Sequence, residues 1–507
     1  MYDILALIIC WHQKEGGEPV ATGSCPERPS RLPQTEHTSV SRLCAILLGV
    51  LAPAAVILWM SPPAYALPSF TGQTGLPCSA CHIGGFGPQL TPFGIYFKAT
   101  GYTVGGGTGV WSHVPVNYQI LAGYTHLAKD RPTAPKGYGT NDFVTPGCSS
   151  FVIAAGHSFE GKFGVGGIVK VFINLSNAFV VQSGQVASLG PSDIKFTKPL
   201  TVGSHSLVVA FDLNNQATLS DPYDNNLYSY YGQGFSMEGP ANAISPGASP
   251  HITGVVKGVV GATLSVFLDN AIYAEGGIYG SMNASQLAAI GTSPPSVGYI
   301  AGGAPYLRLA YQHAWGNNFL EIGGLMMNMP YQQVAGIANA SAENEYIDWG
   351  LDAMYQRTYG PDILAVTANY LFETQNLGAT FGAGKSSNSS DTLDQLRVTV
   401  TYAWNGATEF SLAYIDTWGS TDAKLYPAGP LTGSANHSPN SQTIIAQVDW
   451  APWGNNTNHW GYPWLNVRVG VQYRYYLQFN GGTTNYDGFG RNAIDNNTVL
   501  IFTVWSF

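Results

Sequence analysis

Charged side chains are scarce in this sequence. Asp, Glu, Lys and Arg together make up only 10% of its 507 residues, which is low for a water-soluble protein of this length. A disordered chain is also excluded, because aromatic residues reach 12%. The net charge of −9 argues against nucleic acid as a partner, since the phosphate backbone attracts basic surfaces.

Cysteine is equally sparse, and the sequence contains no disulfide framework. Three of the six cysteines lie in a region that we expect to be absent from the mature protein: Cys10, Cys25 and Cys44. The mature chain would keep Cys78 and Cys81, which are separated by two residues, and one further thiol, Cys148. We interpret Cys148 as a packed, unreactive side chain.

One long apolar run is present, at residues 43–60, preceded by Arg42 and followed by Ala64-Tyr65-Ala66. A membrane-spanning helix is the alternative, but Pro53 interrupts the run, which is short for a span. We therefore expect a secretory signal peptide over residues 42–66, cleaved after Ala66. Residues 1–41 do not fit such a signal, and we interpret them as an over-extended start, which sequencing the N-terminus of the precursor would test.

Close to its start, the mature chain carries Cys78-Ser79-Ala80-Cys81-His82, the attachment motif of c-type haem. In that chemistry both thiols add to the haem vinyl groups, and the adjacent imidazole, here His82, becomes the proximal iron ligand. A thioredoxin-like redox pair would open a helix after a buried strand, and no such pattern surrounds Cys78. A zinc site would need a fourth ligand at finger-like spacing, and none lies nearby. The motif predicts one covalent haem c.

The expected haem segment, residues 67–110, is too short to enclose this cofactor alone. A chain of about forty residues rarely builds a core of its own, and a haem is large and apolar. Gly84, Gly85, Gly87 and the glycines of 105–107 indicate turns and a hinge, while residues 90–100 read as a short helix. The remainder of the chain must therefore supply walls for the haem.

From residue 111 to 507 the pattern changes to alternation of apolar and polar residues. Between Leu465 and Tyr475, for example, the odd-numbered residues are apolar and the even-numbered ones are polar or glycine. Runs of about ten such residues are typical of tilted membrane strands, whereas a soluble β-sandwich, the alternative, would not require so few charges. We count about sixteen runs by this criterion: 114–127, 148–156, 162–173, 193–199, 205–213, 254–268, 270–282, 305–314, 318–329, 345–357, 362–374, 392–404, 407–417, 441–452, 464–476 and 496–507.

The connections between these runs mostly alternate between long and short. The exception is 452–463, which is long where a short connection is expected. Bacterial outer-membrane barrels have an even strand number, short periplasmic turns and long external loops. The sequence therefore predicts an all-β fold, a transmembrane antiparallel β-barrel of about sixteen strands whose lumen is plugged by the small α/loop haem segment. Both termini would be periplasmic, and the last strand closes on Phe507.

The chain resembles the fused monohaem cytochrome–porins found in the outer membrane of iron-oxidising bacteria. The resemblance lies in LPSF (67–70), CSACH (78–82), PQLTPFG (88–94) and FKATGYT (97–103), with a second patch in LNNQATLSDPY (213–223). It covers the haem segment well and the barrel mainly as a pattern. Phe93 stands where family members often carry methionine, so this helix offers no methionine ligand at that position.

The resemblance implies an Fe(II)-oxidising cytochrome, which takes an electron from extracellular Fe(II) and passes it through the haem to a periplasmic cytochrome c or copper protein. Keeping iron outside would also avoid precipitating ferric product within the cell. Two alternatives share the same sequence features: a conduit that carries electrons outward to an extracellular acceptor, and a solute porin whose haem plug is structural or sensory. Outer-membrane lipid is a partner in all three.

The second axial ligand is left open by the sequence. Candidates are His113, His126 and His157 near the first strands, and Met354 on a later strand, although each is an ordinary structural residue in the simpler interpretation. Arginines on faces assigned to the lumen could bind the haem propionates, or could pair with Asp348, Asp352 and Asp449 in a polar porin wall. These arginines are Arg308, Arg397, Arg468 and Arg474. No loop carries clustered carboxylates or histidines for Fe(II), and outer-sphere electron transfer would not require them.

Overall fold

The computed structural model describes residues 68–105, 116–133, 139–159, 169–180, 185–189, 192–223, 243–289, 299–332 and 343–507. All of them belong to one unit, Pro63–Phe507. The expected signal peptide at 42–66 and the expected over-extended start at 1–41 lie outside the described residues, as do Cys10, Cys25 and Cys44.

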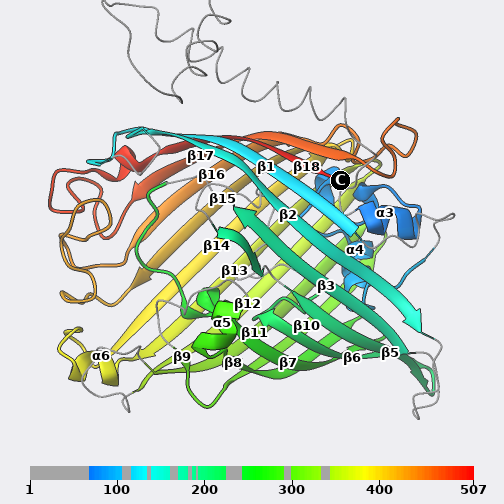
Figure 1. Cartoon of the computed structure of the whole chain (residues 1–507), viewed down its shortest axis with the longest axis horizontal. Coiled ribbons are helices and arrows are strands. Elements are labelled where there is room, and N and C mark those ends of the chain that lie inside the picture. Colours follow the sequence, from blue (N-terminus) through cyan, green and yellow to red (C-terminus); the bar gives the residue numbers. More distant parts are fainter. Residues whose placement is uncertain are drawn as a thin grey trace, which may run out of the picture. The chain divides into compact units, whose positions relative to one another are not determined.

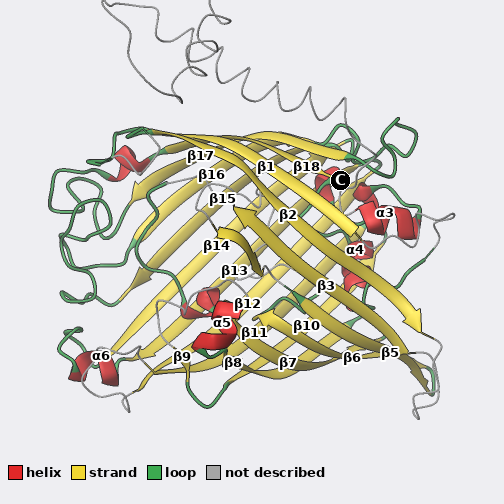
Figure 2. Cartoon of the chain, in the orientation of Figure 1, coloured by secondary structure: helices red, strands yellow, loops and turns green. Residues whose placement is uncertain are grey.

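The described strands form one antiparallel sheet that closes on itself, because β1 pairs with both β2 and β18. Of its eighteen strands, β4 (Gln185–Leu189) and β9 (Tyr299–Ile300) are short additions, and the other sixteen form the barrel (Figure 2). These sixteen are β1 (Val116–Leu127), β2 (Asp142–Phe159), β3 (Val169–Val180), β5 (Asp193–Val202), β6 (His205–Gln216), β7 (Val256–Leu268), β8 (Ile272–Ser281), β10 (Ala304–Trp315), β11 (Asn318–Gln332), β12 (Glu343–Tyr359), β13 (Asp362–Asn376), β14 (Ser390–Trp404), β15 (Thr408–Gly419), β16 (Ser441–Trp450), β17 (Asn466–Gln478) and β18 (Thr498–Ser506). Each overlaps one predicted run, so the predicted fold class is confirmed.

Every strand with described side chains presents one face to the outside and one to the lumen. In β12 the exposed fraction is 54% at Trp349 and 65% at Leu351, but 0% at Asp348 and 5% at Asp352. Exposed apolar side chains and buried polar ones are the reverse of what water selects, and they suit a barrel whose outer wall contacts lipid. The period of two therefore placed the residues on the correct faces.

One end of the barrel, which we call the short-turn end, carries the tight connections 203–204, 269–271, 316–317, 360–361 and 405–407. Asp269 and Asn270 have φ values of 51° and 52°, a left-handed backbone that Asp and Asn tolerate in tight hairpins. The opposite, long-loop end carries the longer connections. Figure 1 shows α3 (Pro68–Thr74), α4 (Pro92–Ala99) and the C-terminus at the short-turn end, and α6 (Gly378–Gly382) at the other.

The helices are short, and α5 (Ala284–Ala289) completes the set in the described part of the chain. Helix α4 begins where expected, because Pro92 occupies its first turn and the Thr91 side chain accepts a hydrogen bond from the N–H of Gly94 at 3.1 Å. In the described ranges they are accompanied by four single 3-10 turns: Cys78–Ala80, Ile83–Gly85, His251–Gly254 and Ala493–Asn496. Among the described helices, none has the length and apolar character needed to cross a bilayer.

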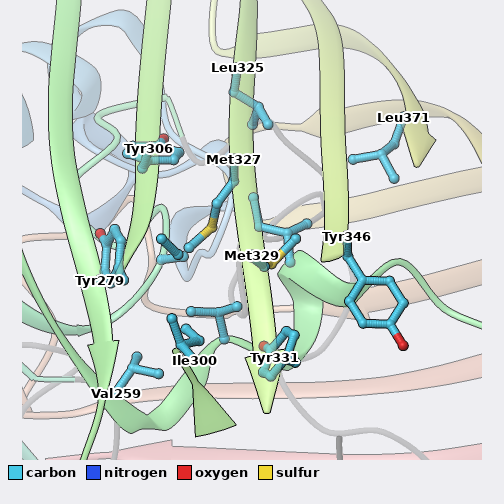
Figure 3. Packing of buried hydrophobic residues seen from close by; sticks show 14 of the residues in the cluster. Val259, Tyr279, Ile300, Tyr306, Leu325, Met327, Met329, Tyr331, Tyr346 and Leu371 are labelled. Carbon is cyan, nitrogen blue, oxygen red and sulfur yellow. The ribbon is translucent and has the colours of Figure 1, made fainter. Parts of the chain in front are cut away.

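Residues 243–255 fold into the lumen from the long-loop end. Ile252 belongs there to the buried cluster that also contains Met327, Met329 and Tyr331 of β11. Figure 3 shows these three residues of β11 among their neighbours in the cluster. The N–H of Ile252 also donates a hydrogen bond to Oδ2 of Asp348 at 2.9 Å. This bond gives a buried carboxylate oxygen a hydrogen-bond partner. The lumen is thus filled partly by the chain's own connections.

Candidate functional site

The segment 68–105, which we call the plug, packs inside the barrel near the short-turn end. Ile83 contacts Ala365 of β13 and Ala403 of β14, and Phe86 packs against Phe502 and its neighbours on β18. Leu90, Ile95 and Ala99 join a further buried cluster, whose wall residues are Ala310, Phe319 and Met354 together with Tyr223, Phe267 and Tyr273. The wall residues in these clusters are buried rather than exposed on the outer face, so the plug occupies the lumen.

Polar side chains of the wall fix the backbone of the plug. Arg468 donates to the carbonyl of Gly87 at 2.5 Å, while Asp449 accepts from Nε and Nη2 of the same guanidinium at 2.7 and 2.8 Å. Asn466 donates to the carbonyl of Gly85 at 2.9 Å, and Gln356 to that of Leu90 at 2.8 Å. Charge-assisted bonds of this kind are about twice as strong as neutral ones, so Arg468 is a principal anchor.

The plug approaches the wall so closely at two glycines that no side chain would fit. A Cβ atom on Gly84 would lie 2.2 Å from Oε2 of Glu409, and one on Gly85 would lie 2.6 Å from the carbonyl oxygen of Gly406. Both glycines also have a left-handed backbone, with φ values of 72° and 76°. The glycines that indicated turns in the sequence therefore also permit contact between plug and barrel.

The motif residues Cys78, Cys81 and His82 share one turn. The N–H groups of Cys81 and His82 both donate to the carbonyl of Cys78, at 3.1 and 2.9 Å. These two hydrogen bonds hold the backbone of the three motif residues in one compact turn. Thr91 holds the turn from the other side through its side chain, which donates to the carbonyl of Ala80 at 2.6 Å.

The motif thiols of Cys78 and Cys81 are not joined in a disulfide. Burial raises the pKa of Cys81 to about 12, and burial likewise raises the pKa of Cys78 above its ordinary value. Reactive redox cysteines have a lowered pKa, and burial shifts the pKa of these two thiols in the opposite direction. Among the described residues no group of three His, Cys, Asp or Glu side chains is placed to hold a metal ion.

His82 is oriented by a glycine. The backbone of Gly87, at φ 95°, runs against the Nδ1 side of the imidazole, and a Cβ atom there would lie 2.8 Å from Nδ1. The Nε2 side of the ring is therefore the side that could bind iron. In metal sites the nitrogen that does not bind the metal, here Nδ1, is usually held by contacts with the protein. Cys78, Cys81 and His82 are each half-buried. The donor set therefore fits a haem c.

Residues 451–465, which we call the mouth turn, cover Cys78. This connection between β16 and β17 is the one that was long where the sequence predicted a short one. The carbonyl of Gly454 accepts a hydrogen bond from the N–H of Ser79 at 2.9 Å. Cys78 lines a small pocket together with Trp453, His459 and Tyr462 of the mouth turn. In the sequence, only the unexpected length of this β16–β17 connection pointed to its contact with the plug. None of its residues was predicted to belong to the site.

The predicted second-ligand candidates fall in different places. Met354 is 1% exposed and packs in the cluster that contains Leu90, so the fold brings it to the plug. His126 alternates with the buried Thr125 and Leu127 and therefore faces outward, where it bonds Asp142 at 2.8 Å; it is not brought to the lumen. His113 lies outside the described residues, and for His157 only the backbone, in β2, is described.

The four lumenal arginines also separate. Nε of Arg308 lies 3.2 Å from Asp221, and its Nη atoms contact Glu321 and Asp352 in a buried ion cluster. Arg468 pairs with Asp449 and the plug, so for these two the polar-wall interpretation describes the observed contacts. Arg397 and Arg474 lie on the lumen side of β14 and β17, half-buried, and their role as propionate partners stays a prediction.

The second patch of the predicted resemblance, residues 213–223, also folds inward. Its Asp221 joins the Arg308 cluster, and Tyr223 packs edge-to-face on Tyr273 with ring centroids 6.1 Å apart. Tyr223 is also a member of the cluster that contains Ile95 and Ala99 of α4. This loop therefore contributes to the seat of the plug.

Fold and site together define a closed sixteen-stranded antiparallel barrel with an internal plug that displays a Cys-x-x-Cys-His motif. No family model matches the sequence, and no curated protein matches it. Among solved structures the chain is similar to OmpT of Vibrio cholerae (10% identity over 77% of this chain and 96% of that one, TM-score 0.41). It is likewise similar to OmpF of Salmonella typhi, solved with daunomycin (11%, 77% and 97%, TM-score 0.44), and to a mutant porin of Rh. blastica (11%, 77% and 99%, TM-score 0.38). Similarities this distant say nothing of what the chain binds.

Proposed function

We propose that this protein is an outer-membrane electron-transfer protein that holds one haem c on Cys78 and Cys81, with His82 as an axial ligand. The observation that carries the proposal is the position of the motif: both thiols and the imidazole lie on one turn of a plug seated in the barrel lumen. A bound haem supplies reversible one-electron chemistry. The proposed electron donor is extracellular Fe(II), and the acceptor is a periplasmic cytochrome c or copper protein.

The chain's own residues support transfer of electrons rather than of solutes. Arg468 and Asn466 fasten the plug at the short-turn end, and Ile252 with its neighbours enters from the long-loop end. In bacterial barrels short turns face the periplasm, which orients the motif toward a periplasmic carrier. The outward apolar residues suit a lipid environment, and a wall in the outer membrane would keep ferric product outside. These features match what the resemblance to fused monohaem cytochrome–porins implies.

The test is to purify the protein from a strain that matures c-type cytochromes and to stain the denatured polypeptide for covalent haem. Cys78→Ala combined with Cys81→Ala should abolish the stain, and Cys148→Ala should leave it unchanged. Stopped-flow mixing of the ferric protein with Fe(II) should then reduce the haem, followed at its α-band. A protein that stains but is not reduced by Fe(II) would retain the haem assignment and lose the iron assignment.

The solute-porin alternative makes the opposite prediction in liposomes. A barrel fitted with the plug should not admit sugars, so liposomes that contain the intact protein should not swell in isotonic sugar solutions. Swelling at the rate of an open porin would contradict the proposal and favour a permeable channel.

A further inference from the structure

The mouth turn contacts the haem motif directly. It contributes Trp453, His459 and Tyr462 to the cavity that Cys78 also lines, and Gly454 bonds the backbone of Ser79. A haem c joined to the sulfur of Cys78 would have its attached edge beside this pocket. The side chains of the turn are consequently those that a bound haem would meet.

His459 is held within this group by its neighbours. Its ring stacks on Trp453 with centroids 5.3 Å apart and an interplanar angle of 7°, and Tyr462 packs edge-on at 6.0 Å. The N–H of Gly461 donates to Nδ1 of His459 at 3.1 Å, so Nε2 is the nitrogen left for another partner. The side chain is half-buried, and the residues around it carry no charge over the whole of 451–465.

Other described ligand candidates are engaged elsewhere. Met354 does not line the cavity beside Cys78, and its sulfur accepts a hydrogen bond from Gln356 at 2.7 Å. His205 pairs with Asp269 at the exposed β5–β6 turn, and His251 pairs with Glu373 beneath the long loops. Four further histidines have described side chains. His126 on β1 and His313 on β10 face the outer wall, His437 lies in the long loop 420–440, and His82 belongs to the motif itself.

We infer that His459 of the mouth turn supplies the second axial ligand to the iron of the haem attached at Cys78 and Cys81. The inference rests on the proposed function, because it requires a haem at that motif. If His459 binds the iron, the barrel itself contacts the cofactor carried by the plug, and this contact explains why the mouth turn is long. Iron binding through Nε2 requires the ring proton to reside on Nδ1, so the contact with the Gly461 N–H must be released when the haem is bound.

Two nitrogen ligands also have an electronic consequence. An axial methionine raises the reduction potential of a c-type haem relative to two imidazoles. A histidine from the mouth turn would therefore give this protein a lower potential than the His/Met ligation that Met354 would provide.

The test compares variants of the purified haem protein by electron paramagnetic resonance of the ferric state, by optical spectroscopy and by redox titration. The wild type should give the low-spin signal of two imidazole ligands. His459→Met should convert the spectrum to the His/Met type and raise the potential, and His459→Gly should become high-spin and recover the low-spin signal on addition of imidazole. Met354→Leu and His126→Gln, the matched controls, should leave the spectrum unchanged.

The outcomes separate this inference from the proposed function. A covalent haem whose spectrum is unaltered in His459→Met and His459→Gly, or is altered in Met354→Leu instead, would overturn the ligand assignment only. Absence of covalent haem from the wild type would overturn both. Covalent haem staining and the heat-dependent gel mobility of the barrel show for each variant that the chain has folded and matured.

Discussion

At the scale of single residues, the structure shows which neighbours fix the residues of the haem motif. Cys78 and Cys81 were assigned from their spacing alone, but the orientation of His82 depends on Gly87, whose backbone occupies the space beside Nδ1. Arg468 then holds the carbonyl of that same Gly87. An iron ligand needs a fixed ring as well as a lone pair, and the fixing groups come from both the plug and the wall.

Gly87→Ala is expected to disturb the haem ligand directly. The new Cβ would lie 2.8 Å from Nδ1 of His82, in addition to the strain of a non-glycine residue at φ 95°. Gly203→Ala is the matched control, since Gly203 also has a positive φ, 63°, but a Cβ there meets no atom within 4 Å. Both changes should cost about 1 kcal/mol in backbone strain, but only Gly87→Ala should shift the haem absorption and its potential. Equal spectra for the two variants would contradict the role of Gly87.

Asp221 gives the stability a pH dependence. Burial raises the pKa of its carboxyl from 3.8 to about 6, against the opposing effect of Arg308. Between these values the folded chain holds a proton that the unfolded chain has lost, so the free energy of unfolding should fall as the pH rises through that window, by roughly 3 kcal/mol in total.

The measurement is urea unfolding in detergent micelles between about pH 3 and about pH 7, the interval that brackets the two pKa values. Asp221→Asn cannot titrate and should flatten the dependence by that amount. Asp269→Asn is the control, because Asp269 is exposed and bonding to His205 lowers its pKa. Parallel curves for wild type and Asp221→Asn would show that this carboxyl does not set the slope.

At the scale of elements, the mouth turn is the clearest case of a connection that departs from the barrel rule for a local reason. A two-residue hairpin would suffice to join β16 to β17, as it does for β5 and β6. The longer turn instead bends over the plug and encloses the cavity at Cys78. Its length is therefore explained by what it covers rather than by the strands that it joins.

Replacing residues 453–463 by a short hairpin should uncover Cys78 without preventing assembly of the barrel, because the pairing of β16 and β17 lies outside the turn. In haem-free protein whose only cysteine is Cys78, labelling by a maleimide should become at least about tenfold faster, since the thiol no longer waits for local opening. Trp460→Ala is the control: it removes a side chain that is 72% exposed and should leave the rate unchanged. An unchanged rate in the shortened variant would mean that the turn does not shield Cys78.

At the scale of the whole molecule, the barrel and its plug depend on each other. The lumen side chains Asp449, Glu409 and Arg468 form buried ion pairs, whose desolvation is tolerated because the partners and the plug carbonyl satisfy them. The plug, in turn, is too small to bury its apolar residues without the wall. Neither part has its complete set of partners alone.

Deleting residues 68–105 should therefore convert the protein into a leakier and less stable barrel. Removal of the plug leaves the guanidinium of Arg468 without its carbonyl partner and exposes Ala365 and Ala403 to the lumen. Liposomes carrying the truncated protein should swell in sugar solutions while those with the full chain do not, and the gel-mobility transition should move to a lower temperature. Tight liposomes with the truncated barrel would show that the inward loops alone close the lumen.

The sequence by itself determined the strands, their two faces and the chemical motif. All of these are local: alternation has a period of two, and Cys78, Cys81 and His82 lie within five consecutive residues. The one long connection at the short-turn end was also visible, as an anomaly without an explanation.

Only the tertiary structure decided which distant residues meet the motif. Arg468 and His459 are far from Cys78 along the chain, and their approach depends on strand register and barrel closure, which alternation does not encode. The same closure placed His126 on the outer wall and Met354 beside Leu90, although both were equal candidates in the sequence. Contacts across a lumen arise from the closed geometry, and no run of neighbouring residues can specify them.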